Sequence, residues 1–312
     1  MLRIIFVGVL ASLFFSSTFV LNRVMSLEGG HWVWSASLRY FWMLGFLGVW
    51  LVVTGRGKLG IQALGVFRRY FLFWILAGSV GFGVFYALIT FSSVYSPGWV
   101  VAATWQTTIL ATPFVLLGFG RKVPLKAVAL TLVIFIGVVL VNIEQASTAN
   151  LTDTLLGALP VLVAAFAYPF GNQLVWEARH TKRRFIPSIT HPVMDDAVCR
   201  VLLLTLGSLP LWGILILVTT PPPPSGGQIL QTAIVAVCSG VIATSLFLYA
   251  RHSAQSTAEL AAADCTQSME VVFSLAGEAV LLGHVAPGTL GWSGIALTMT
   301  GLILYMKVQS AK

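Results

Sequence analysis

Residues 4–21 of the chain read IIFVGVLASLFFSSTFVL and contain no charged side chain. A helix needs about 20 predominantly apolar residues to cross the hydrocarbon core of a bilayer. The stretch is too long for the apolar part of a typical signal peptide, and no small-residue cleavage site follows it. We therefore expect residues 4–22 to form a first transmembrane helix that the protein retains.

Nine further stretches have the same apolar character. They are residues 33–53, 71–92, 98–118, 125–143, 154–176, 198–218, 229–249, 260–282 and 288–306. Over the whole chain, 57% of the residues are hydrophobic and 9% are charged, and the mean hydropathy is +0.91. A soluble domain is about a quarter charged. The composition therefore predicts an all-α integral membrane protein with ten transmembrane helices and no soluble domain.

The basic residues gather in alternate loops, as they do when cytoplasmic loops retain positive charge. Of the 18 Lys and Arg residues, 15 would lie on one side of the bundle: Arg3, Arg56, Lys58, Arg68, Arg69, Arg121, Lys122, Lys126, Arg179, Lys182, Arg183, Arg184, Arg251, Lys307 and Lys312. The opposite side holds only Arg23. This asymmetry predicts cytoplasmic N and C termini in a multi-pass protein of the cell (inner) membrane. The net charge of +8 then indicates orientation, and no nucleic acid is expected as a partner.

Short motifs recur in the same order in two halves of the chain, residues 1–146 and 147–312. The matched pairs are Ser37–Phe41 with Val198–Leu202, and Trp105-Gln106-Thr107 with Thr266-Gln267-Ser268. Each half would contain five helices, so the second half would enter the membrane from the opposite face. Inverted repeats of this kind place a solute site near the middle of the membrane and permit alternating access.

Four passages carry a family resemblance. They are Leu38–Phe41, Phe85–Leu88, Ser245–Ala250, and Gly277-Glu278 leading through Pro287 to Gly294 and Gly301. The chain resembles the drug/metabolite transporter (DMT) superfamily in its ten-helix, EamA-like branch, and is most similar to the multidrug resistance efflux transporter group. The resemblance implies export of small organic solutes and a structural role for Glu278, which matches the glutamate that closes the ninth helix in that superfamily.

Charged side chains inside transmembrane helices are costly, so each one marks a candidate site. The stretch 260–282 contains Asp264, Glu270 and Glu278. At about 100° per residue, one face of a continuous helix would carry Asp264, Gln267, Ser268, Ser274 and Glu278. We expect Asp264 and Glu270 to be candidates for proton coupling. The alternatives are pairing of Asp264 with Arg251, and hydrogen bonding of Glu270 within a helix interface.

Polar and aromatic residues in other apolar stretches are predicted to line a central cavity: Asn22, Arg39, Tyr86, Trp105, Gln106, Tyr168, Asn172 and Gln267. Trp105 beside Gln106 would suit an organic cation or an aromatic solute. Arg39 would bind a carboxylate or a phosphate, or would instead extend to the interface or clamp backbone carbonyls. Its counterpart Arg200 is expected to pair with the acids at 195–196.

The sequence thus predicts a secondary transporter that exports small organic solutes by alternating access, with the solute, the lipid bilayer and protons as its partners. Two alternatives remain open at this point. One is a metabolite or amino-acid exporter or exchanger without proton coupling, and the other is a non-transporting membrane receptor or assembly subunit. We expect no catalytic residues, no cofactor and no metal. Cys199, Cys238 and Cys265 have no metal-ligand spacing, and the sequence contains no catalytic constellation.

Overall fold

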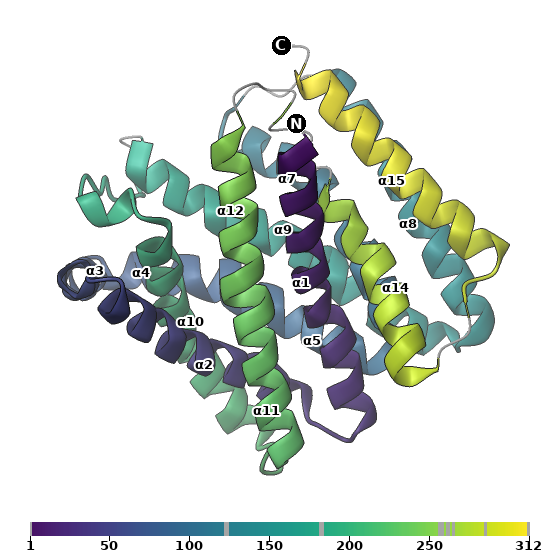
Figure 1. Cartoon of the computed structure of the whole chain (residues 1–312), viewed down its shortest axis with the longest axis horizontal. Coiled ribbons are helices and arrows are strands. Elements are labelled where there is room, and N and C mark those ends of the chain that lie inside the picture. Colours follow the sequence, from purple (N-terminus) through teal and green to yellow (C-terminus); the bar gives the residue numbers. More distant parts are fainter. Residues whose placement is uncertain are drawn as a thin grey trace.

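The computed structural model describes residues 2–121, 125–180, 184–254, 259, 263, 266–283 and 286–310. Within these residues the regular structure is helical, without a strand (Figure 1). The elements are α1 (Leu2–Leu27), α2 (Trp32–Val53), α3 (Gly57–Arg69), α4 (Phe71–Gly78), η1 (Ser79–Val84), α5 (Phe85–Tyr95), α6 (Gly98–Trp105), α7 (Thr108–Gly118), α8 (Leu125–Thr148), α9 (Leu151–His180), η2 (Pro192–Met194), α10 (Ala197–Thr219), α11 (Gly226–Val235), η3 (Ala236–Ala243), α12 (Thr244–Ser253), η4 (Thr266–Ser268), α14 (Met269–Leu282) and α15 (Thr289–Ser310).

Seven helical segments in the described part of the chain are long and apolar enough to cross a membrane. They are α1, α2, Phe71–Tyr95, Gly98–Gly118, α9, α10 and Gly226–Arg251. Two shorter apolar helices, Leu132–Ser147 and Thr289–Leu304, lie within α8 and α15. Large apolar side chains point outward, as Leu72 and Val280 do with exposed fractions of 78% and 82%. Lipid tolerates such side chains, so the chain is a multi-pass membrane protein.

Helix α3 connects two of these segments and was not among the expected helices. It is amphipathic, with Ala63 and Val66 buried against neighbouring helices and Arg68 and Arg69 in its last turn. It lies at the edge of the molecule (Figure 1) and contacts α2, α4 and α10. A short helix with a basic face is typical of the membrane–water interface. The segment between the second and third apolar stretches is therefore helical and does not run as an open loop.

Irregular turns occur within the apolar segments at matching places in the two halves. The segments that begin with α4 and α11 contain the π-helical turns η1 and η3. The segment α6–α7 breaks at Gln106-Thr107, and in the second half the 3₁₀ turn η4 directly precedes α14. Such irregular turns are frequent at functional sites. In η1 the carbonyl oxygen of Phe82 accepts a hydrogen bond of 3.1 Å from the Tyr40 hydroxyl.

The contacts between helices also correspond in the two halves. Helix α1 contacts α14, η3 and α12, while α9 contacts α6, α7, η1 and α5. Helix α2 contacts α11 and η3, while α10 contacts α4 and η1. Helices α8 and α15 lie side by side at the periphery (Figure 1). These contacts between the two halves therefore occur in corresponding pairs.

Glycines allow the interrupted segments to approach their neighbours closely. A Cβ atom added to Gly81 in η1 would lie 2.9 Å from the Cα of Gly171 in α9. A Cβ on Gly137 in α8 would lie 2.7 Å from the carbonyl oxygen of Gly294 in α15. Small residues at such crossings are the usual means of bringing helix backbones together in membranes. The backbone of η1 is thereby held directly against α9.

Candidate functional site

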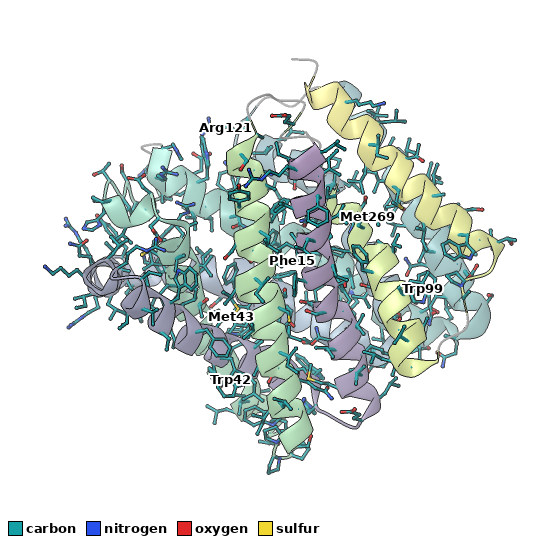
Figure 2. All side chains as sticks on the ribbon, viewed as in Figure 1. Phe15, Trp42, Met43, Trp99, Arg121 and Met269 are labelled. Atoms are coloured by element: carbon teal, nitrogen blue, oxygen red, sulfur yellow. The ribbon has the colours of Figure 1, made fainter. Side chains whose placement is uncertain are left out.

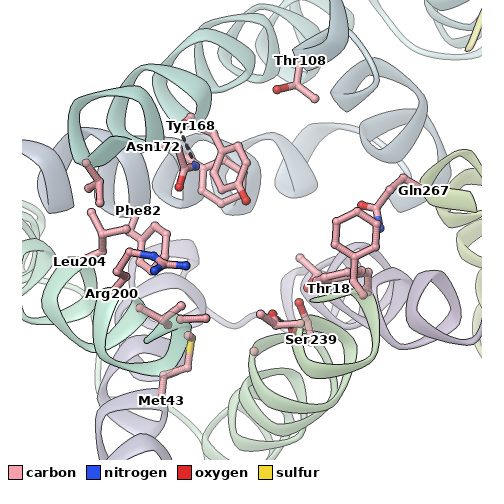
Figure 3. Close-up of a pocket in the computed structure, with 18 of the residues that line it drawn as sticks. Thr18, Met43, Phe82, Thr108, Tyr168, Asn172, Arg200, Leu204, Ser239 and Gln267 are labelled. Atoms are coloured by element: carbon pink, nitrogen blue, oxygen red, sulfur yellow. Dashed lines mark hydrogen bonds between the residues drawn. The ribbon is translucent and has the colours of Figure 1, made fainter. Parts of the chain in front are cut away.

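A cavity of about 560 Å³ lies between the two halves of the chain. The residues that line it come from α1, α2, η1, α5, α6, α7, α9, α10, η3, α12, η4 and α14. Figure 3 shows Thr18, Ser239 and Gln267 along one wall, and Phe82, Arg200 and Leu204 along the opposite wall. Cavities of this size hold small organic molecules.

Equivalent residues of α2 and α10 face the cavity. The lining residues are Arg39, Tyr40 and Met43 on α2, and Arg200, Val201 and Leu204 on α10. In each helix they occupy positions i, i+1 and i+4, which lie on one face. The motif that the two halves share in the sequence therefore contributes the same face of a helix to one cavity from both sides.

Three aromatic rings form one continuous part of the wall. The ring centroid of Phe85 lies 4.8 Å from that of Trp105 and 5.0 Å from that of Tyr168. Trp105 and Tyr168 meet edge to face at 5.6 Å. Farther along the cavity, the ring of Phe15 on α1 (labelled in Figure 2) meets that of Phe247 on α12 edge to face, with the ring centroids 6.3 Å apart. These groups offer a large apolar surface to a ring-bearing solute.

Arg39 is the charged group at the inner face of α2, with 8% of its surface exposed. Its Nη2 donates a hydrogen bond of 2.9 Å to the Ser239 hydroxyl of η3, and its Nε has no partner within the described residues. Its guanidinium carbon lies 4.1 Å from the centroid of the Tyr86 ring. Behind it, the Asn22 amide donates a hydrogen bond of 3.1 Å to the Tyr86 hydroxyl. Asn22 and Tyr86 thus support Arg39 from outside the cavity.

Glu270 is the buried acid of the site. It lies in the first turn of α14, with 3% of its surface exposed, and it lines the cavity. No hydrogen bond or ion pair joins it to another described residue within 4.0 Å. The helix dipole at the start of α14 favours a negative charge there. Next to it, the side-chain Nε2 of Gln267 is buried without a partner in the described structure.

Glu278 lies at the other end of α14 and is fully buried. Its Oε1 accepts a hydrogen bond of 2.6 Å from the backbone N–H of Gly98, and its Oε2 accepts one of 3.3 Å from Trp99. These are two of the N–H groups at the start of α6, which have no partner within their own helix. Glu278 therefore fastens the beginning of α6 to the end of α14.

Comparison with known proteins places these features in a family. A family model described as "EmrE: Putative multidrug resistance efflux transporter" matches residues 2–311. The chain belongs to this family of efflux transporters. The uncharacterized protein YjlA of Bacillus subtilis (strain 168) is 39% identical over 97% of this chain and 94% of its own length. An uncharacterized 42.1 kDa protein of Shouchella clausii is 38% identical over 80% of this chain and 65% of its own length.

A solved crystal structure is similar in fold to this efflux-family chain. It covers 99% of the chain and 97% of its own, with a TM-score of 0.61 and 15% sequence identity. At that identity the likeness concerns the fold alone. The description of the family as an efflux transporter is consistent with a cavity that can hold a small molecule.

The structure brings six of the residues predicted from the sequence to the cavity: Arg39, Trp105, Tyr168, Asn172, Gln267 and Glu270. Asn22, Tyr86 and Gln106 are buried outside it, and the Gln106 amide donates instead to the carbonyl oxygen of Ala102 at 3.3 Å. Asp264 lies outside the described residues. The expected continuous polar face of residues 264–278 is interrupted, because η4 changes the helical period at residues 266–268.

Arg200 differs from its expected role. It forms no ion pair within 4.0 Å with the acids at 195–196, and its Nη1 donates instead to the carbonyl oxygen of Met194 at 2.5 Å. Asp195 pairs with Arg179 at 2.6 Å, and Asp196 pairs with Arg56 at 2.6 Å. The Asp196 carboxylate also accepts a hydrogen bond from the Cys199 N–H and so caps α10. Both acids are therefore engaged elsewhere, and Arg200 faces the cavity.

Several lining residues were absent from the sequence predictions. They include Thr18, Phe82, Thr108 and Ser239. Hydroxyl groups can satisfy themselves on the preceding turn of their own helix, so their presence in an apolar stretch gives little information. The Ser239-Gly240 pair is more informative than a lone hydroxyl residue, because a glycine beside a serine lies within the irregular turn η3.

Proposed function

We propose that the chain is a secondary transporter that exports a small organic solute by alternating access between two inverted repeats, residues 1–146 and 147–312. The observation that carries the proposal is the cavity between the halves, which is lined from equivalent helices and contains Glu270, a buried acid without an ion-pair partner among the described residues. A receptor or an assembly subunit needs no such cavity. We infer transport because the chain belongs to a family of efflux transporters and the cavity can hold a small organic molecule.

The proposed topology has ten transmembrane helices. The seven long apolar segments would be joined by α8, by the segment that ends with α14, and by α15. The correspondence of helix contacts and of helix breaks between the halves supports the inverted repeat. With ten helices both termini lie on one side, and α1 begins near the place where α15 ends (Figure 1). The distribution of basic residues supports assigning that side to the cytoplasm.

In this orientation the cavity opens toward the cytoplasm. Its walls extend to Arg179 and His180 at the end of α9 and to Arg251 in α12, all on the side that carries most of the loop charge. Arg121, which follows α7, lies at the same end of the molecule (Figure 2). The opposite end is closed by the contacts of Arg39 with Ser239 and of Glu278 with α6. We infer that the structure corresponds to the inward-open state, in the cell (inner) membrane.

Glu270 is the proposed coupling residue. A carboxylate that is buried and has no partner among the described residues is costly in its charged form, so its protonation would change what the cavity can bind. Coupling then follows because the affinity for the solute would depend on whether Glu270 carries a proton. Gln267, whose amide donor faces the same region without a partner among the described residues, would help to hold the solute.

The test is a flux assay with the full chain in proteoliposomes. An imposed proton gradient should drive accumulation of at least one radiolabelled solute from a panel of aromatic carboxylates, amino acids and quaternary ammonium dyes. Glu270→Gln should abolish the effect of the gradient, whereas Glu28→Gln, at an exposed loop position, should preserve it. A solute flux that does not depend on the proton gradient would favour a facilitated exporter. If no solute moved faster than it does in protein-free liposomes, transport would be contradicted.

A further inference from the structure

The described charges in and around the cavity are mostly positive. Arg39 and Arg200 line it, Arg179 and Arg251 lie at its mouth, and Glu270 is the acid among its described lining residues. Arg179 is neutralised by Asp195 at 2.6 Å. The described salt bridges of Arg56 and Arg121 use the acids Asp196 and Glu177, outside this lining. The cavity therefore retains the charge of Arg39 and Arg200.

These two arginines are equivalent residues of the two repeats, at opposite ends of the cavity. Arg39 lies in the second turn of α2, at the closed end, and Arg200 lies at the start of α10, beside the mouth. Each uses one described hydrogen bond, to the Ser239 hydroxyl and to the Met194 carbonyl oxygen respectively. A guanidinium has five N–H donors, so both retain donors for a ligand.

The neighbours of Arg39 hold its guanidinium in one position, which favours a role in binding a ligand. It is nearly buried, its guanidinium stacks over the Tyr86 ring at 4.1 Å, and the Asn22 amide fixes the Tyr86 hydroxyl. Its Nε is buried without a partner in the described structure. An arginine that reached for the membrane interface would carry its head group into water. A rigid guanidinium with a free donor instead suits a carboxylate, which it can bind with two parallel hydrogen bonds.

The aromatic wall of the cavity indicates that the ligand also contains a ring. Phe85, Trp105 and Tyr168 present adjoining rings within 5.6 Å of one another, and they line the same cavity as Arg39. A solute with a ring and an anionic head could place the ring on this wall and the head on an arginine. An organic cation would meet Arg39 and Arg200, which form no ion pair within 4.0 Å with a described acid, and a single described acid, Glu270. This balance of charges opposes its binding.

We propose that the transported solute is an aromatic organic acid, whose carboxylate is held by Arg39 at the closed end of the cavity and is attracted into it by Arg200 at the mouth. This proposal rests on the transport function proposed above and names its substrate class. Because inverted repeats exchange their roles when access alternates, Arg200 would become the inner anchor in the outward-open state.

The test compares three probes with the same body and different heads: 3-phenylpropionate, 3-phenylpropionamide and 3-phenylpropylamine. Their dissociation constants are measured on the full chain in detergent by calorimetry. The acid should bind at least about tenfold more tightly than the amide and the amine, because only its carboxylate can accept charge-assisted, bidentate hydrogen bonds from Arg39. Arg39→Gln should remove this preference and leave the affinity for the amide unchanged, and Arg39→Lys should restore part of it.

Arg200→Gln should have a smaller effect on the affinity for the acid and should weaken the dependence of its association rate on salt. Arg23→Gln is the matched control. Arg23 is a half-buried arginine of α1 that donates to the carbonyl oxygens of Ser93 and Val94 and does not contribute to the cavity lining. Thermal unfolding of every variant establishes that it is folded.

Four results would overturn the proposal. They are preference for the amine, equal affinity for all three probes, no binding of any probe at millimolar concentration, and an acid preference that survives Arg39→Gln in a folded variant. The flux assay separates this result from the function itself. Gradient-driven flux of a panel solute without an acid preference would refute only the substrate class. An Arg39-dependent acid preference without flux would support the anion site and contradict transport.

Discussion

Replacement of Glu278 by alanine should destabilise the protein without altering what its cavity binds. The Glu278 carboxylate accepts hydrogen bonds from the N–H groups of Gly98 and Trp99, at 2.6 and 3.3 Å, and no part of its surface is exposed. Alanine would leave both N–H groups buried without an acceptor. An unsatisfied buried donor costs about 1–3 kcal/mol. Since the bond to Trp99 is long, we expect a total loss of about 3 kcal/mol.

Glutamine at the same position should show an intermediate effect. It retains one oxygen that can accept the shorter bond from Gly98, but loses the charge, and neutral hydrogen bonds are about half as strong as charge-assisted ones. The expected loss is about 1–2 kcal/mol. With about 2 °C per kcal/mol for a chain of this size, the midpoint of thermal unfolding should fall by about 6 °C for Glu278→Ala and about 3 °C for Glu278→Gln.

The assay is thermal unfolding of the full chain in detergent, followed by intrinsic tryptophan fluorescence. Glu28→Ala is the control, because Glu28 is an exposed acid whose carboxylate accepts from the Gln231 amide at 2.9 Å. It should shift the midpoint by less than about 1 °C. The reasoning would be refuted if Glu278→Ala shifted the midpoint no more than this control, or if glutamine were as damaging as alanine.

Three further predictions concern the cavity and its walls. Glu270→Gln should make the transport rate independent of pH in the range where the wild-type rate varies, as measured by flux at matched membrane potential. Gly81→Leu should lower the unfolding midpoint by the equivalent of about 3 kcal/mol, because its Cβ would lie 2.9 Å from the Gly171 Cα, whereas Gly45→Leu, with open space around it, should not. Trp105→Ala should raise the KM of an aromatic solute about tenfold and leave that of an aliphatic acid nearly unchanged.

The helical stretches could be predicted closely from the sequence. The expected range 33–53 corresponds to α2 at Trp32–Val53, and the expected range 198–218 corresponds to α10 at Ala197–Thr219. The physical reason is that lipid offers no hydrogen bonds, so an apolar stretch of sufficient length must satisfy its backbone as a helix. Hydropathy alone does not reveal α3, whose two faces average to a moderate polarity.

The direction in which each polar side chain points could not be predicted in the same way. Asn22, Tyr86 and Arg39 all occupy apolar stretches, yet only Arg39 reaches the cavity. Their orientation depends on the rotation of each helix, which is set by contacts with neighbours far away in the sequence. The Tyr86 hydroxyl was available to Asn22 only because α1 and α5 lie against each other. A pattern of residues along one helix carries no information about that partner.

Matched residues of the two repeats differ in whether their polar groups form hydrogen bonds. Gln106 and Gln267 are matched in the sequence, but the Gln106 amide is satisfied by the Ala102 carbonyl, whereas the Gln267 Nε2 has no partner within the described residues. Thr108 lines the cavity from the first half and donates to the Ala165 carbonyl at 3.2 Å. Glu270 lines the cavity from the second half, one residue beyond the position that matches Thr108, and makes no such bond to a described residue. At these positions Thr108 of the first half joins two helices, whereas Gln267 and Glu270 of the second half have no partner among the described residues. A coupling step is therefore expected to depend on α14 and not on its counterpart α7.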